Sequence, residues 1–297
     1  MKAALRIRRA SVKFIFALVA ASCTSGCVKP AAPIPPNDAE APRWTFTTEA
    51  SPKGVFLVVH GLNLRPSALD PLCGFLASQG YHSYRMTLKG HNEPSGEIFD
   101  GAEWLRDVEA AYALSHERFP KLPVYALGYS IGGLLLTTMV EENPESLRPK
   151  GMILLAPAIS LRTFFDVAGG LGLPPSTSWS VPNVAPAAYR RYELTPIFWY
   201  SNTLELYSKM QRSTNASHLK SVPTLIVLNP DDELVSESGV ERFVSKNAIS
   251  PEWRIALVHP EPVEKGLKEH LIIDSTSLGQ QEWRRLKTLI ANFLSGI

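Results

Sequence analysis

The chain has 297 residues, of which 45% are hydrophobic, and this length and composition suit a single large core. Its 30 basic residues nearly balance its 28 acidic residues, and the only dense basic run lies at residues 6–13. This distribution argues against a nucleic-acid-binding groove in the body of the protein. The sequence also lacks the motifs that hold metals or cradle phosphates, so we expect neither a metal nor a nucleotide cofactor.

Residues 1–27 have the features of a lipoprotein-type export signal. Basic residues precede the apolar run 14–21, which is too short to span a bilayer as a helix, and small residues and cysteines follow it. Both Cys23 and Cys27 end stretches similar to the lipobox of bacterial lipoproteins, and a plain secretory signal is the alternative. The proline-rich residues 28–42 then predict a tether. We therefore expect an exported protein that a lipid anchors to a membrane of the cell envelope.

Residues 43–297 alternate between predicted strands and predicted helices. The continuous apolar run 54–59 is typical of a strand that is covered on both faces. The other predicted strands are 43–48 (an edge strand), 81–86, 122–127, 152–155, 224–228 and 254–258, and the predicted helices are 67–79, 102–119, 131–142 and 280–294. This alternation predicts an α/β fold with a mostly parallel central sheet and helices on both faces.

Residues 160–218 interrupt that alternation. They are rich in aromatic and turn-forming residues and too long for a simple loop, so they predict a cap inserted above the site. The alternative is an ordinary pair of packing helices. Cys73 lies in an apolar helical pattern without an obvious partner, which predicts a buried thiol and no disulfide framework.

The sequence Gly128-Tyr129-Ser130-Ile131-Gly132 stands between a predicted strand and a predicted helix. A serine nucleophile at such a strand-to-helix turn needs small residues two places to either side, because the flanking backbones come close together. This context predicts that Ser130 is the nucleophile of a serine hydrolase.

A serine nucleophile also needs a base and an acid that orients the base. Asp231 and Asp232 both follow the strand predicted at 224–228, and the spacing favours Asp232. His259 and His270 are the histidines that follow this acid, and His270 is preferred because it precedes the last helix.

Oxyanion donors are expected from the N–H of Ile131, directly after the nucleophile, and from the N–H of Leu62, in the loop after the strand predicted at 54–59. His60 and His91 are interpreted as residues that organise loops.

Together these motifs resemble the α/β-hydrolase superfamily, especially its monoacylglycerol-lipase-like and serine-aminopeptidase-like branch. The resemblance covers nearly all of residues 43–297 and implies triad roles for Ser130, Asp232 and His270, oxyanion roles for the N–H groups of Leu62 and Ile131, and a cap over an acyl pocket. The chain departs from the family at Asn92, where members often have Gly-His-Gly, and at Leu62-Asn63, where members carry glycine.

The favoured function is hydrolysis of small acyl esters through an acyl-Ser130 intermediate. A serine peptidase or amidase with the same triad is one alternative, and a non-catalytic surface binding lipoprotein is another. Residues 160–188 contain a single acidic residue, Asp166, among several large apolar ones, which favours an apolar acyl slot. Further along the insertion, aromatic residues are assigned to the same slot: Phe198, Trp199 and Tyr200. Glu193 and Glu205 keep the peptidase alternative open.

Overall fold

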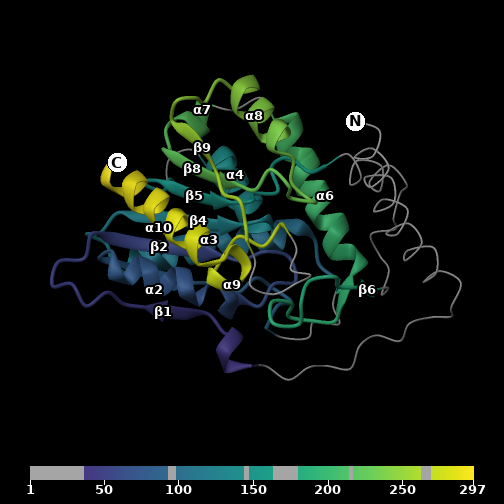
Figure 1. Cartoon of the computed structure of the whole chain (residues 1–297), viewed down its shortest axis with the longest axis horizontal. Helices are drawn as coiled ribbons and strands as arrows, with labels where there is room; N and C mark the ends of the chain where they lie inside the picture. Colours follow the sequence, from purple (N-terminus) through teal and green to yellow (C-terminus); the bar gives the residue numbers. More distant parts are fainter. Residues whose placement is uncertain (1–36, 93–97, 144–146, 163–179, 214–216, 262–268) are drawn as a thin grey trace, which may run out of the picture.

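The computed structural model describes residues 37–92, 98–143, 147–162, 180–213, 217–261 and 269–297. Its centre is a seven-stranded sheet in the order β1-β3-β2-β4-β5-β8-β9, in which only β1 runs antiparallel to its neighbour (Figure 1). The strands are β1 (Arg43–Thr45), β2 (Gly54–Val59), β3 (Tyr81–Arg85), β4 (Val124–Tyr129), β5 (Met152–Leu155), β8 (Thr224–Leu228) and β9 (Trp253–Leu257). This mostly parallel sheet confirms the predicted fold class.

Helices cover both faces of the sheet, and each face has its own buried cluster. One cluster includes residues of α2 (Asp70–Ser78), α9 (Ser275–Leu278) and α10 (Gln280–Ser295), the last of which crosses the strands in yellow in Figure 1. The other includes residues of α3 (Gly101–Arg118), α4 (Ile131–Glu142), α6 (Ile197–Arg212), α7 (Ser217–Lys220) and α8 (Glu237–Lys246). None of the helices in the described ranges is both long and apolar enough to span a bilayer.

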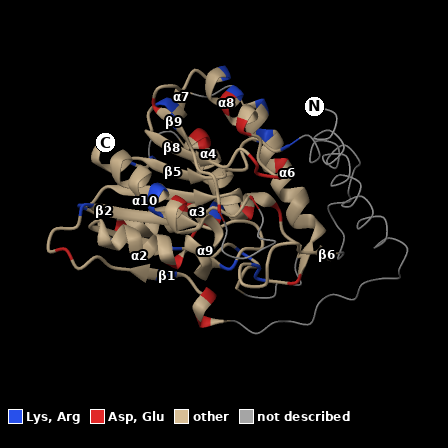
Figure 2. Cartoon of the chain, in the orientation of Figure 1, with Lys and Arg blue, Asp and Glu red and all other residues tan. Residues whose placement is uncertain are grey.

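The strands supply both clusters because successive side chains point to opposite faces. In β2, Leu57 and Val59 join the cluster of α3 and α4, whereas Phe56 and Val58 join the cluster of α2 and α10. Burying each such side chain contributes about 1.5–3 kcal/mol. Strands β2, β4, β5 and β8 contain no charged residue, and charged positions of both signs lie on the surrounding helices and loops (Figure 2).

Several element boundaries differ by a few residues from the prediction, and two of these differences follow from proline, which lacks an N–H group. Strand β4 begins at Val124, after Pro123, rather than at residue 122. The helix expected over 67–79 is divided into a short 3₁₀ turn, η2 (Pro66–Leu69), and α2, which has Pro71 near its start. A proline is tolerated in the first turn of a helix but does not continue one.

The described part of the inserted segment contains a two-stranded antiparallel hairpin, β6 (Ser180–Pro182) and β7 (Leu194–Pro196), followed by α6 and α7. Helix α6 packs against α3 and α4, and its Phe198 and Trp199 are 5% and 2% exposed within the core. These two aromatic residues therefore belong to the core, and their assignment to an acyl slot was wrong. Phe164, Asp166 and Trp179 lie outside the described residues.

The N-terminal end of the described chain is fixed to the domain by the 3₁₀ turn η1 (Asp38–Glu40). Glu40 is 2% exposed, and its two carboxylate oxygens accept hydrogen bonds from the N–H and the hydroxyl of Ser67, each at 3.0 Å. The buried guanidinium of Arg85 donates to the carbonyls of Ala39 and Ala41. The expected tether extended to residue 42, whereas residues 37–41 already form part of the folded domain; residues 1–36 lie outside the described residues.

The predicted buried thiol is confirmed, because Cys73 is 1% exposed in the cluster of α2 and α10. Burial raises the pKa of the Cys73 thiol to about 11. The side chain therefore packs as a small apolar group.

The Glu40 contacts predict a measurable stability difference. Glu40→Ala should lower the free energy of unfolding by about 1–3 kcal/mol, because it leaves two donors of Ser67 without their acceptor. Asp38→Ala, on the exposed side of the same turn, should change it by less than about 0.5 kcal/mol. Urea denaturation of both variants is the measurement, and equal midpoints for the two variants would contradict this role of Glu40.

Candidate active site

Ser130 lies at the sharp turn between β4 and α4, with φ 53° and ψ −117°. A Cβ added to Gly128 would come within 2.7 Å of the backbone of Gly132, and a Cβ added to Gly132 would collide with the carbonyl of Val59. Both positions therefore require glycine. The positive φ of a non-glycine residue is a local strain that such functional turns store, and it presents the serine at the end of the strand.

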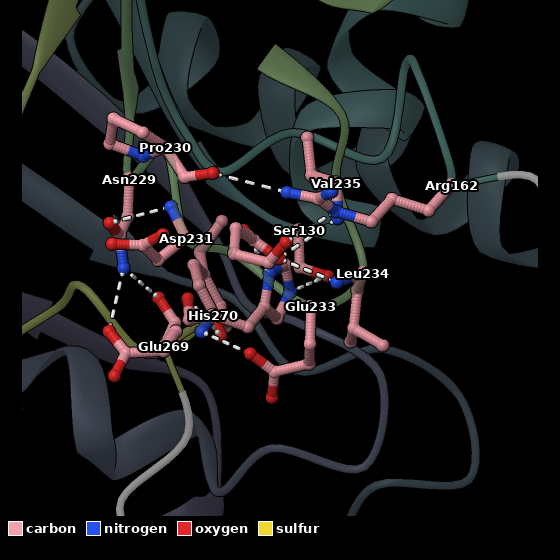
Figure 3. A network of polar contacts seen from close by, with 12 residues as sticks. Ser130, Arg162, Asn229, Pro230, Asp231, Glu233, Leu234, Val235, Glu269 and His270 are labelled. Carbon is pink, nitrogen blue, oxygen red and sulfur yellow. Dashed lines mark hydrogen bonds and ion pairs between the residues drawn. The ribbon is translucent and has the colours of Figure 1, made fainter. Parts of the chain in front are cut away.

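The structure brings together the three residues that the sequence proposes as a triad. Ser130 Oγ is 2.8 Å from His270 Nε2, and His270 Nδ1 is 2.7 Å from Asp232 Oδ2. Figure 3 shows the polar network around Ser130 and His270. His270 and Asp232 are 7% and 1% exposed. With Nδ1–H donated to the carboxylate, Nε2 is free to accept the serine proton.

The two competing residues occupy other positions. Asp231 is exposed, and its N–H donates to Asn229 Oδ1 at 3.1 Å, so that it forms part of the turn. His259 is also exposed, at the end of β9, and its N–H donates to a carboxylate oxygen of Glu282.

Two sets of hydrogen bonds hold the loop that carries Asp232. Asp232 Oδ1 accepts hydrogen bonds from the N–H groups of Leu234 at 2.7 Å and Val235 at 2.9 Å, which fix the orientation of the carboxylate. Arg162, at the start of the insertion, donates to the carbonyls of Asp232 at 2.6 Å and Pro230 at 3.1 Å (Figure 3). The acid is thus fixed by its own loop and by the segment that follows β5.

The environment of His270 favours its protonated form. Burial lowers the pKa of His270, but the charge and hydrogen bond of Asp232 and the charge of Glu233 outweigh burial and raise this pKa above its usual value of 6.5. Glu233 also accepts the His270 N–H at 3.0 Å, and the hydroxyl of Tyr129 donates to the His270 carbonyl at 3.1 Å. Neither Glu233 nor Tyr129 was predicted as a site residue. The sequence feature that could have indicated them is their position next to Asp232 and Ser130.

His60 and His91 are neutral residues that organise loops, as predicted. His60 Nδ1–H donates to the Gly61 carbonyl at 2.8 Å, and Nε2 accepts the Leu88 N–H at 3.0 Å. Burial lowers the pKa of His60 to about 4 and holds that of His91 well below its usual value. His91 stacks on Trp199 with ring centroids 4.3 Å apart.

The two predicted oxyanion donors belong to Ile131, which follows Ser130 directly, and to Leu62, which follows Gly61. Ile131 is the first residue of α4, where an N–H has no intrahelical acceptor. Gly61 packs so closely on the nucleophile turn that an added Cβ would lie 3.3 Å from Ser130 Cβ, and Leu62 follows directly. The Leu64 N–H donates to the Gly61 carbonyl at 3.2 Å, which closes a turn around Leu62 and Asn63. Within the described ranges, no group of three or more His, Cys, Asp and Glu side chains is arranged to hold a metal ion.

Comparisons with known proteins agree with this arrangement. The family model Hydrolase_4, serine aminopeptidase S33, matches residues 50–258, a range that contains Ser130 and Asp232 and ends before His270. The monoglyceride lipase homolog of Monkeypox virus is 23% identical, over 81% of this chain and 90% of its own. Phospholipase YtpA of Bacillus subtilis is 25% identical, over 71% of this chain and 89% of its own.

Solved structures show the same fold. A soluble variant of the monoglyceride lipase from Saccharomyces cerevisiae superposes with a TM-score of 0.67 at 15% identity, over 86% of this chain and 91% of its own. Because the family model matches well over half of the residues, the chain belongs to the serine aminopeptidase S33 (Hydrolase_4) family, on an α/β-hydrolase fold.

Proposed function

We propose that this protein is a serine hydrolase that cleaves carboxylic esters through a covalent acyl-Ser130 intermediate. The observation that carries the proposal is the continuous hydrogen-bonded chain from Ser130 through His270 to Asp232. The names of the relatives, monoglyceride lipases and a phospholipase, support ester bonds as the target.

In the first half of the reaction, Ser130 Oγ attacks the ester carbonyl carbon while His270 Nε2 takes the serine proton. The negative charge on the carbonyl oxygen is stabilised by the N–H groups of Leu62 and Ile131. His270 then gives its proton to the leaving alcohol, and the C–O bond to that alcohol breaks. The acyl group remains on Ser130.

In the second half, His270 removes a proton from a water molecule, which attacks the acyl carbon. The bond to Ser130 Oγ breaks, Oγ regains the proton from His270, and the carboxylic acid leaves. Asp232 stabilises the positively charged imidazole in both halves. Its two backbone hydrogen bonds keep the carboxylate oriented throughout.

A peptidase activity is the alternative that the family description raises, because an aminopeptidase must bind the charged amino terminus of its substrate. The two acidic residues that kept this alternative open are both exposed, and Glu193 forms an ion pair with Arg190 at 3.6 Å. Neither forms a buried anchor for an amine. A non-catalytic binding role is disfavoured by the complete hydrogen-bonded triad.

We further propose that the mature protein is exported and attached to a membrane of the cell envelope through a lipid on Cys23 or Cys27. The support lies in the sequence: a basic start, a short apolar run, small residues and two candidate cysteines. A tether over residues 28–36 would connect this anchor to the domain.

Triad variants test the mechanism. Ser130→Ala and His270→Ala should each reduce kcat by up to about 10⁶-fold, and the double variant should lose little more, because triad members act as a unit. Asp232→Asn should leave a folded protein with a large loss of kcat, whereas Asp231→Asn should have a small effect. The measurements are steady-state kinetics and labelling by a fluorophosphonate. A larger loss for Asp231→Asn would overturn the assignment of the acid.

A substrate panel tests the bond type and the acyl preference. We expect kcat/KM to rise from acetyl towards butyryl or hexanoyl esters, because each buried methylene contributes about 0.8 kcal/mol in an apolar slot. Aminoacyl anilides should be turned over slowly. Faster cleavage of an aminoacyl anilide than of every simple ester would favour the peptidase alternative.

Phase partitioning tests the anchor. The full-length exported protein should enter the detergent phase, and a chain that begins at Asn37 should remain in the aqueous phase with the same kcat/KM, because it retains the Glu40 contacts. Cys23→Ser and Cys27→Ser variants identify the modified residue. Aqueous partitioning of the exported full-length protein would rule the anchor out.

A further inference from the structure

Asn63 occupies a special backbone position in the predicted oxyanion loop. It is the third residue of the turn that the Leu64-to-Gly61 hydrogen bond closes, and its φ is 49°. A positive φ at this place favours glycine or asparagine. It is also one of the positions at which this chain departs from the glycine that the family carries. Glycine alone would satisfy the backbone, so the asparagine side chain needs a separate explanation.

Asn63 is 2% exposed, and its amide oxygen and amide nitrogen both form hydrogen bonds to the inserted segment. Its Oδ1 accepts the Tyr192 N–H at 2.8 Å, and its Nδ2 donates to the Tyr192 carbonyl at 3.1 Å and to Thr195 Oγ1 at 2.6 Å. The pairing with one donor and one acceptor of Tyr192 fixes which way the amide points. The amide therefore reaches two residues that lie 129 and 132 positions after Asn63 in the sequence.

The Asn63 backbone is held as firmly as its side chain. Its N–H donates to His91 Nε2 at 2.9 Å, and its carbonyl accepts the Arg191 N–H at 2.8 Å. After Asn63, Leu64 forms an isolated antiparallel β-bridge with Arg190, and the Arg65 N–H donates to the Tyr189 carbonyl at 2.7 Å. Residues 189–195, hereafter the clasp, thus lie along the loop from Asn63 to Arg65.

The peptide of Leu62 lies between two fixed points. On one side, Gly61 packs against Ser130 and the ring of Tyr129. On the other side, Asn63 is held by the clasp and by His91. Since the Asn63 N–H is used by His91, of these two neighbouring N–H groups only that of Leu62 can serve as the predicted oxyanion donor.

We propose that Asn63 is a positioning residue through which the clasp fixes the N–H of Leu62 for the oxyanion. This inference rests on the proposed ester hydrolysis and adds to it the device that aligns one oxyanion donor. The effect should appear in the transition state, because the oxyanion forms only there. Removing one oxyanion donor costs about 10²–10³-fold in kcat, and misplacing a reacting group by 1 Å costs about 10²-fold.

Asn63→Gly is the informative change, because glycine keeps the positive φ and removes only the amide. In the full chain, we expect kcat on the best ester of the panel to fall about 10- to 100-fold, with KM changed by less than about threefold. The rate of fluorophosphonate labelling should fall in parallel, since phosphonylation uses the same donors. Thr195→Val, which removes one acceptor of the amide, should change kcat in the same direction by a smaller factor.

Asn183→Ala is the matched control. The Asn183 side chain accepts the Ala185 N–H at 2.8 Å, inside the inserted segment, and makes none of the contacts to Asn63. This variant should keep the wild-type kcat. Hydrogen exchange should be faster over residues 189–195 in Asn63→Gly and unchanged there in Asn183→Ala.

The outcomes separate the possible failures. A wild-type kcat in folded Asn63→Gly, or an equal loss of kcat in Asn63→Gly and Asn183→Ala, overturns the positioning role. If Asn63→Gly does not fold by circular dichroism, Thr195→Val decides, and an unchanged kcat in that variant overturns the role. If the wild-type protein neither reacts with the fluorophosphonate nor cleaves any ester, the proposed function itself fails.

Discussion

The close approach of the nucleophile turn to the end of β2 is the constraint on which the site depends. Gly132 lies against the carbonyl of Val59, and Gly61 lies against the ring of Tyr129, next to Ser130, so that a Cβ at either position would collide with these atoms. This steric contact places the start of the predicted oxyanion loop beside the nucleophile turn, independently of any polar interaction. His60 then connects the same loop to Leu88, beyond the neighbouring strand β3.

Each loop of the candidate site is also tied to the inserted segment. Arg162 holds the acid loop, the clasp holds the predicted oxyanion loop, and the Tyr189 hydroxyl donates to the carboxylate of Asp274, after His270, at 2.9 and 3.0 Å. The insertion leaves the sheet after β5 and returns to it at the neighbouring strand β8, which the loop with Asp232 follows. The insertion was expected only to cover the site, but its residues also form hydrogen bonds with three loops of the site and so contribute to the geometry of that site.

The elements and the triad could be predicted because their signals are local. The apolar runs that became β5 and β8 have the predicted bounds, and the glycine spacing around Ser130 follows from its turn. The contacts of Asn63 could not be predicted, because a buried amide that joins residues about 130 positions apart leaves no periodic pattern. Phe198 and Trp199 were misassigned because large aromatic residues suit a core and an acyl slot equally.

The buried histidines His60 and His270 differ in the direction of their pKa shifts, and His270 is the one that exchanges a proton with Ser130 in the proposed reaction. His60 pairs with backbone groups, and burial keeps its pKa near 4, so its neutral form stabilises the fold above pH 6.5 and this contribution is lost as the pH falls towards 4. His270 pairs with a carboxylate, which raises its pKa; its contribution is fully present below pH 6.5 and is lost as the pH rises through the raised value. A general base must be neutral, so His270 becomes active over the pH range in which its pairing with Asp232 stabilises the fold less. Glu233 and Tyr129 form hydrogen bonds with the backbone of His270, and these bonds do not depend on the charge of the imidazole ring. They therefore hold the base in place in the pH range in which His270 is neutral.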